Sequence, residues 1–251
     1  MKKSPSVFNL YSRYYDLLYQ DKNYAAEVKY IKGLLDLHGV CHGDLLELGS
    51  GTGKHGCLLA KLGYHVHGIE RSAEMLGHVN YVDGFTCEQG DICSLQLNRS
   101  FDAVLALFHV VSYQTTNANL RSVFSSAYKH LQEGGLFIFD FWYSPAVYAQ
   151  KPSVRIKRIE DNKFNIIRLA EPVSYPNSNR VDVVYTIISH EVNGNEMQST
   201  TETHSMRHFS LPEIELLASI HGFDVIGAEE FLSSKAIGED TWGICVTLKR
   251  L

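Results

Sequence analysis

The chain has 251 residues, with 23 basic and 28 acidic side chains and 45% apolar residues. This size and composition predict one large folded domain with a buried core, and exclude disordered, collagen-like and coiled-coil classes. The formal charge of −5 leaves no basic face for a phosphate backbone, so nucleic acid is not an expected partner.

The cysteines and the apolar runs indicate in which cellular compartment the protein is expected to work. The five cysteines form an odd set without a CxxC pair, which favours free thiols in a cytoplasmic protein. The longest apolar run, residues 103–111, is shorter than the ~20 residues that span a bilayer, so no membrane partner is expected. The first residues contain lysines but no apolar stretch typical of a secretory signal. Six of the fourteen tyrosines precede residue 31.

Strand and helix patterns alternate through the first half of the chain. Apolar spacing predicts a helix over residues 23–37, and a second helix follows the glycine-rich loop as far as Leu62. Ser72 is placed to cap another helix, and a further helix is expected at 117–131, ended by Gly134 and Gly135. Buried strands are expected at residues 64–70, 101–108 and 136–141. This order predicts a doubly wound, seven-stranded, mostly parallel Rossmann-like α/β sheet, with ligands at the carboxyl ends of its strands.

Residues 144–209 show a purely β pattern. They predict an antiparallel insertion of two hairpins between the fifth strand and the last helix, with Asn193-Gly194 as one turn. Ser210 and Glu213 form a capping-box pattern that opens the last helix. Closing strands are expected at 223–231 and 242–249. The predicted organisation is therefore a single domain, 1–251. It consists of an aromatic N-terminal segment at the entry to the site (1–43), a cofactor-binding core (44–143 and 210–251) and the insertion (144–209).

The loop Gly49-Ser50-Gly51-Thr52-Gly53 is the most informative stretch. Alternate glycines let the backbone turn sharply and approach a ligand, and the next helix presents free N–H groups. A dinucleotide fingerprint would need its third glycine where Lys54 stands, which disfavours a Rossmann dehydrogenase. Glu47, just before the loop, would repel a pyrophosphate but suits the amino group of a zwitterionic amino acid.

Two further acids extend this pattern. Glu70 ends the next strand, 19 residues after Gly51, where an acidic side chain accepts ribose hydroxyls. Asp91 follows the third strand, where a carboxylate can accept from an adenine amine. Ribose, adenine and an aminocarboxyl group together specify S-adenosylmethionine, with S-adenosylhomocysteine as product. The predicted cofactor-binding residues are Glu47, Gly49, Ser50, Gly51, Gly53, Glu70, Arg71, Asp91, Ile92, Leu107, Tyr15 and Tyr24.

The ordered motifs resemble those of class I S-adenosylmethionine-dependent methyltransferases. They are ELGSGTG, the strand ending in Glu70, Gly90-Asp91, FDAVLALFHV and LQEGGLFIFDFW, and they cover about residues 44–142. Within that family, the tyrosine spacing of the N-terminal segment, the aromatic pair Trp142-Tyr143 and the β-rich insertion resemble the branch that methylates nucleotide-linked amino sugars. The resemblance implies methyl transfer to a small-molecule amine.

Two residues beyond the fourth strand are the predicted catalytic residues. His109 and Tyr113 lie where the transferred methyl group should point, and either could take or relay a proton. Enzymes of the amino sugar branch often have a histidine at the position aligned with Tyr113, so an O-acceptor or a different amine stays open. Aromatic faces of Tyr15, Tyr24 and Trp142 could each stabilise the sulfonium cation by ~0.5–2 kcal/mol.

The last strand of the insertion supplies further candidates. Alternation places His204 and His208 on one face and Arg207 on the other, where Arg207 could hold a substrate phosphate or carboxylate. The predicted substrate-binding residues are Trp142, Tyr143, His204 and Arg207. No metal site is predicted, because Glu202 and the two histidines would have to converge and methyl transfer needs no metal.

Three functions therefore stay open at this point: N-methylation of an amino sugar or similar metabolite, small-molecule O-methylation, and non-catalytic binding of S-adenosylmethionine. Methylation of protein or nucleic acid is disfavoured by the charge balance. It is also disfavoured because Phe108-His109-Val110-Val111 replaces the N/D-P-P-Y/F motif used on bases. The insertion is additionally expected to offer a surface for a homodimer.

Overall fold

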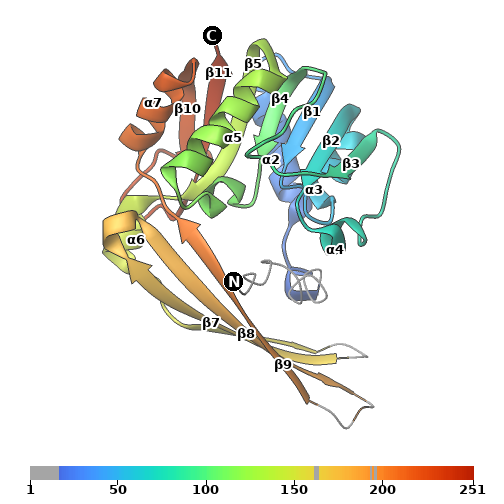
Figure 1. Cartoon of the computed structure of the whole chain (residues 1–251), viewed down its shortest axis with the longest axis vertical. Coiled ribbons are helices and arrows are strands. Elements are labelled where there is room, and N and C mark those ends of the chain that lie inside the picture. Colours follow the sequence, from blue (N-terminus) through green and yellow to red (C-terminus); the bar gives the residue numbers. More distant parts are fainter. Residues whose placement is uncertain (1–16, 161–163, 193, 195–196) are drawn as a thin grey trace.

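The computed structural model describes residues 17–160, 164–192, 194 and 197–251. Across these residues the main sheet has seven strands in the order β10-β11-β5-β4-β1-β2-β3 (Figure 1). Their bounds are β1 (Gly43–Leu48), β2 (Tyr64–Glu70), β3 (Phe85–Gln89), β4 (Phe101–Ala106), β5 (Leu131–Trp142), β10 (Phe223–Glu230) and β11 (Gly243–Arg250). Strands β1 to β5 pair in parallel, whereas β11 is antiparallel to β5 and β10. The predicted Rossmann-like sheet is confirmed.

Helices cover both faces of this sheet, because each face is apolar and must be buried. On one face, α2 (Tyr24–Leu37) and α3 (Lys54–Lys61) contribute Ile31, Leu35 and Leu59 to the core. On the other, α5 (Asn117–His130) and α7 (Leu211–Ile220) pack Phe124 and Ile214 against the sheet. Between these layers, parallel crossovers bring the carboxyl ends of β1, β2 and β4 to one edge.

The insertion forms a second sheet, which extends away from the carboxyl edge of the main sheet (Figure 1). In the described ranges it has four antiparallel strands, β6 (Arg155–Glu160), β7 (Phe164–Tyr175), β8 (Arg180–Glu191) and β9 (Met197–Arg207). The two predicted hairpins are present as β6–β7 and β8–β9, and they form one sheet because β7 and β8 also pair along their whole length across the short turn η2 (Pro176–Ser178). The purely β prediction also misses α6 (Ser144–Gln150), where a proline in the first turn favours a helix start.

The segment just before α2 lies between the two sheets. Leu18 is fully buried in a cluster with Ile159, Ile166 and Ile187 of the insertion. The Lys157 ammonium donates to the Leu18 carbonyl at 2.7 Å and to the Asp21 carboxylate at 2.6 Å. Residues 17–24 are therefore held against the insertion and over the carboxyl edge, and we call them the lid segment below.

Two details predicted for the helix ends differ in the structure. Helix α5 ends at His130 and not at the glycine pair, because the His130 ring hydrogen-bonds the Ser126 carbonyl and accepts from the Leu97 amide. Ser210 precedes α7 without a side-chain cap, and Glu213 instead pairs with Arg207. None of the helices in the described residues is both long and apolar enough to cross a membrane.

Candidate active site

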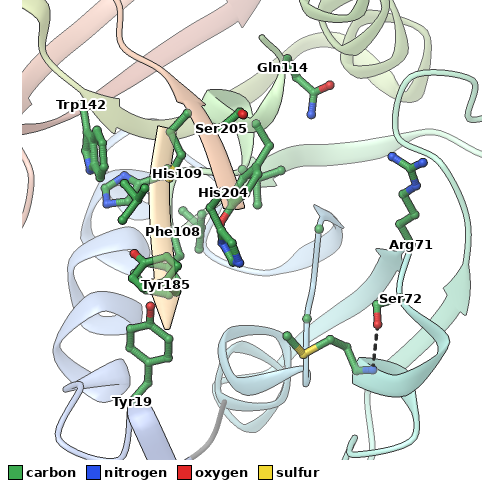
Figure 2. A pocket seen from close by; sticks show the side chains of 18 of the residues that line it. Tyr19, Arg71, Ser72, Phe108, His109, Gln114, Trp142, Tyr185, His204 and Ser205 are labelled. Carbon is green, nitrogen blue, oxygen red and sulfur yellow. Dashed lines mark hydrogen bonds between the residues drawn. The ribbon is translucent and has the colours of Figure 1, made fainter. Parts of the chain in front are cut away.

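A cavity of about 1450 Å³ opens at the carboxyl edge of the main sheet. Its walls come from the ends of β1 to β5 on one side, and from the lid segment and the insertion on the other. A site for one drug-sized ligand measures roughly 300–1,000 Å³, so this cavity has room for two ligands. Figure 2 shows His109, Trp142, Tyr185 and His204 around one part of it and Arg71 and Ser72 on the opposite side.

The glycine loop forms part of the cavity lining, where the sequence predicts the cofactor. Gly49, Gly51 and Gly53 have φ values of 69°, 57° and 74°, which side chains other than glycine rarely adopt. A Cβ on Gly49 would also lie 2.7 Å from the Val110 side chain, so the loop could not approach η1 (Val110–Tyr113) with any larger residue. Gly49, Ser50 and Gly51 line the cavity, whereas Gly53 lies at the start of α3 and does not.

Glu70 organises the loop from the end of β2. One carboxylate oxygen accepts from the Gly51 amide at 2.9 Å, and the other accepts from the Ser72 amide at 2.8 Å. Ser72 in turn caps α4 (Ala73–Leu76) by accepting from the Met75 amide. Glu70 lines the cavity although its side chain is almost buried, so its remaining lone pairs are directed to a ligand and not to bulk water.

Glu47 lies behind the loop, outside the cavity lining. Its side chain is 2% exposed, and burial raises the pKa of its carboxyl to about 8. One oxygen lies 3.7 Å from His55 Nδ1, and the other has no hydrogen-bond partner among the described residues. A Cβ on Gly56 would meet that oxygen at 2.6 Å, so the acid is enclosed beneath the first turn of α3.

The other residues predicted to bind the cofactor lie around the same cavity, apart from Tyr15, which is not described. Arg71, Asp91, Ile92, Leu107 and Tyr24 all line the cavity. The Asp91 carboxylate accepts from the Cys93 amide at 2.9 Å, which fixes the loop after β3. Tyr15 lies outside the described residues.

His109 and a buried acid form a pair on the side of the cavity opposite Arg71 and Ser72 (Figure 2). His109 Nδ1 lies 2.7 Å from the Asp140 carboxylate, and the His109 amide donates to both of its oxygens at 3.2 Å. Phe108 and His109 have φ values of 62° and 64°, so strained backbone turns the imidazole into the cavity. Burial opposes ionisation of Asp140, but the charge and hydrogen bonds of His109 outweigh it and lower the pKa of the carboxyl.

Asp140 is absent from the sequence-based set of candidates. The only sequence signal for it is one acidic residue inside the apolar strand FIFDFW. An ionisable group that is fully buried in a central strand requires a partner, so that pattern could have identified it.

Aromatic side chains form a wall of the cavity beside His109. The edge of Trp142 faces the His109 ring at 5.9 Å between centroids, and Tyr19 meets Phe108 at 5.1 Å. Tyr185 comes from β8 of the insertion and lies close to Tyr19 (Figure 2). Tyr19, Phe108 and Tyr185 were not among the residues predicted from the sequence.

Tyr113 and His204 connect the core to the insertion. The Tyr113 hydroxyl and His204 Nδ1 are 2.9 Å apart, and burial raises the pKa of the tyrosine well above its usual value. Both residues line the cavity. The structure thus brings one predicted catalytic residue and one predicted substrate-binding residue into direct contact.

Two predicted substrate-binding residues do not line the cavity. Arg207 pairs with Glu213 of α7 and donates to the Asn117 side chain at 2.7 Å. These partners hold the guanidinium outside the cavity, so it braces β9 against the core and does not reach a ligand. Tyr143 packs beside the main core and pairs with Phe209 in an isolated bridge.

Comparisons with known proteins agree with this geometry. A family model described as "Methyltransferase domain" matches residues 45–135. The chain is 28% identical, over 84% of its length and 89% of the relative, to dTDP-3-amino-3,4,6-trideoxy-alpha-D-glucopyranose N,N-dimethyltransferase of Streptomyces venezuelae. The structure matches Streptomyces venezuelae DesVI with a TM-score of 0.79 at 24% identity, covering 94% of this chain and 97% of the other. The chain is an S-adenosylmethionine-dependent methyltransferase.

A second structural neighbour extends over the same length. An S-adenosylmethionine-dependent methyltransferase from Clostridium acetobutylicum ATCC 824 matches 98% of this chain and 99% of its own, with a TM-score of 0.78 at 20% identity. The methyltransferase uses S-adenosylmethionine as its cofactor. The residues present fit that group: the Glu70 carboxylate lines the cavity at the end of β2, and no Cβ fits at Gly49 of the loop.

Proposed function

We propose that this methyltransferase methylates the amine of a nucleotide-linked amino sugar or a similar small metabolite. Two relatives support the acceptor class, because both carry the names of dTDP-amino sugar N,N-dimethyltransferases; the second, from Streptomyces fradiae, is 25% identical over 69% of this chain. The cavity size supports an acceptor bound beside the cofactor.

The observation that carries the proposal is the pair formed by His109 and Asp140. An amine that is protonated at neutral pH must lose its proton before its lone pair can attack a methyl group. His109 presents Nδ1 to Asp140 at 2.7 Å, which leaves Nε2 as the nitrogen that can accept the amine's proton. The buried Asp140 carboxylate then stabilises the imidazolium, as carboxylates paired with the other ring nitrogen of a histidine base do in other acid–base sites.

The remaining contribution of the protein is alignment. Bound S-adenosylmethionine supplies the electrophilic methyl group. Trp142, Phe108 and Tyr19 restrict the acceptor to one side of the cavity and exclude water from it. Holding two reactants in line is worth up to ~7–11 kcal/mol of the barrier, so this wall is expected to matter as much as the base.

The insertion supplies charge that suits a nucleotide-linked acceptor. Arg155 of β6, Arg168 of β7 and Lys151 line the cavity and together place three cations on the acceptor side. Arg168 lies 5.3 Å from the Tyr185 ring and 5.9 Å from the Tyr19 ring. A guanidinium held between aromatic faces suits the diphosphate of a nucleotide sugar.

Mass spectrometry of acceptor mixtures tests the proposal. The purified protein and S-adenosylmethionine are incubated with dTDP-linked amino sugars and with the matched dTDP-linked hydroxy sugars. We expect methyl gain on the amino sugars only, and much less with His109→Gln. Methyl gain confined to the hydroxy sugars would favour O-methylation, and cofactor binding without turnover on any acceptor would favour a non-catalytic module; either result contradicts the proposal.

The proposal also includes the oligomeric state and the compartment. We propose that the protein forms a homodimer through the insertion and that it works in the cytoplasm. Apolar side chains on this sheet are exposed, among them Ile156 at 53% and Val173 at 46%. The five cysteines are free thiols, as expected in a reducing compartment. Analytical ultracentrifugation should show a dimer that Ile156→Glu dissociates, and a monomeric wild type would contradict this part.

A further inference from the structure

A chain of charged side chains runs from the lid segment to the acid behind the glycine loop. Lys22 pairs with Glu27 in the first turn of α2, and the Lys22 ammonium also lies over the rings of Tyr24, at 4.7 Å, and Phe108, at 4.2 Å. Glu27 accepts from His55 Nε2 at 2.6 Å. The same His55 ring turns Nδ1 toward Glu47 at 3.7 Å. His55 thus stands between two carboxyls that belong to different elements.

The charged side chains of this series are buried, although apolar side chains in the same positions would stabilise the fold more. Glu27 is 7% exposed, His55 6% and Glu47 2%. Removing ions from water costs several kcal/mol each, and apolar residues of similar volume are often more stabilising than a buried ion pair. His55 also lines the cavity, and the edge of Tyr24 faces its ring at 5.0 Å. Its position argues for a role toward the ligand.

The two carboxyls differ in their protonation. Burial opposes ionisation of Glu27, but hydrogen bonds from His55 and Lys22 outweigh it and lower its pKa, so it is an anion at neutral pH. Burial and the nearby charge of Glu70 outweigh the hydrogen bond that Glu47 accepts from the Gly56 amide and raise the pKa of Glu47 to about 8, so this carboxyl keeps its proton below that pH. A cationic group bound in front of the loop reverses that preference, because it favours the carboxylate form of Glu47.

We propose that His55 is a positioning residue that takes the Glu47 proton when the amino group of the cofactor binds. His55 Nδ1 and the Glu47 oxygen are 3.7 Å apart, so the transfer requires them to approach to hydrogen-bond distance. The O–H bond of Glu47 then breaks, an N–H bond forms at His55 Nδ1, and the resulting imidazolium is held by the Glu27 carboxylate through Nε2. Glu47 is left as an anion behind the loop, and its charge favours an ammonium group bound in front of the loop. No proton enters or leaves the protein, so the exchange is complete within the chain.

The surrounding groups are compatible with that transfer. Those that face the pair from the adjoining elements are Lys22, Tyr24, Glu27, Lys54, Cys57, Glu70 and Cys87. Burial raises the pKa of both cysteines, so they stay neutral around pH 7. Glu70 disfavours the Glu47 anion in the absence of a cation, which makes the transfer dependent on the ligand.

Isothermal titration calorimetry with S-adenosylhomocysteine tests this inference, since that ligand carries the same amino and carboxyl groups. Titrations of the full chain from pH 6.5 to 8.5, in buffers of different ionisation enthalpy, give both the Kd and the number of protons released. Protonation of the ligand's own amino group changes with pH in the same way for every variant, so it cancels when the Kd of a variant is divided by the Kd of the wild type. We expect that His55→Gln releases more protons than wild type, because Glu47 must then lose its proton to solvent.

The same experiment has a quantitative expectation. The ratio of the His55→Gln Kd to the wild-type Kd should rise about tenfold for each pH unit below about 8, and level off above it. Glu27→Gln should shift the ratio in the same direction, because it removes the charge that holds the imidazolium. His65→Gln, whose side chain is 76% exposed, is the matched control and should leave the ratio at one.

Three results would overturn the inference: a ratio that does not vary with pH, equal proton release by wild type and His55→Gln, or a neutral His55 ring at saturating ligand in nitrogen-15 NMR spectra. The NMR measurement uses wild-type protein, so it decides the question even if a variant fails to fold. All three readouts are independent of the acceptor, so failure of the amino sugar proposal would leave them unchanged.

Discussion

Glu70→Gln is expected to weaken S-adenosylmethionine binding about 100-fold. The two carboxylate oxygens of Glu70 accept from different backbone amides, Gly51 and Ser72. Whichever way the glutamine amide is turned, its NH2 group faces one of those N–H groups, so one hydrogen bond of the loop is lost. The ligand also loses one charged acceptor. Each of these losses costs roughly 1–3 kcal/mol, and a total of about 3 kcal/mol corresponds to about a 100-fold change in Kd.

Isothermal titration calorimetry measures this change directly. Glu74→Gln is the matched control, because Glu74 also lines the cavity rim but supports neither of the two amides. We expect the control to bind within about threefold of wild type. A folded Glu70→Gln protein that binds S-adenosylmethionine as tightly as the control would refute the assignment of Glu70 to the cofactor, and with it the account of how the loop is held.

Three further predictions follow from single side chains. His109→Gln should lower kcat by about 10²–10⁴ while the Kd for S-adenosylmethionine stays unchanged, and single-turnover assays with an unaffected rate would remove His109 as the base. Phe124→Ala should lower the free energy of unfolding by about 3–5 kcal/mol in urea, because the ring is fully buried; a loss under 1 kcal/mol would contradict this packing. Burial and the nearby Arg207 charge lower the pKa of His208 from 6.5 to about 4, so the unfolded chain binds more protons in that range. The stability from neutral His208 is thus present above pH 6.5 and declines as the pH falls toward 4; urea titrations of His208→Asn that keep this slope would argue against it.

The cofactor half of the site was predictable because its determinants are local. The glycines at 49, 51 and 53 require a sharp loop wherever they occur, and Glu70 and Asp91 follow strands that can be identified from apolar runs. The parallel order of those strands then places all of these residues at one edge. The structure puts Glu70, Asp91 and most of the predicted set around one cavity.

The acceptor half was not predictable to the same degree, because its residues meet across long stretches of sequence. Asp140 is one acid in an apolar strand, and nothing near it in the chain shows that its carboxyl meets His109, 31 residues away. Arg207 is a residue type that often binds phosphate, but the packing of β9 against α7 gives it Glu213 as an ion-pair partner. Tyr19 and Tyr185 reach the cavity only because the lid segment packs against the insertion.

The sequence by itself determined the fold class, the resemblance to a methyltransferase family and the loop that is predicted to hold the cofactor, since each depends on periodicity or spacing within about 100 residues. Only the tertiary structure decided which ionisable groups are neighbours. The Glu27–His55–Glu47 chain and the His109–Asp140 pair each join different elements. Burial sets the charge of these groups, and burial is a property of how helices, sheets and the lid segment pack together.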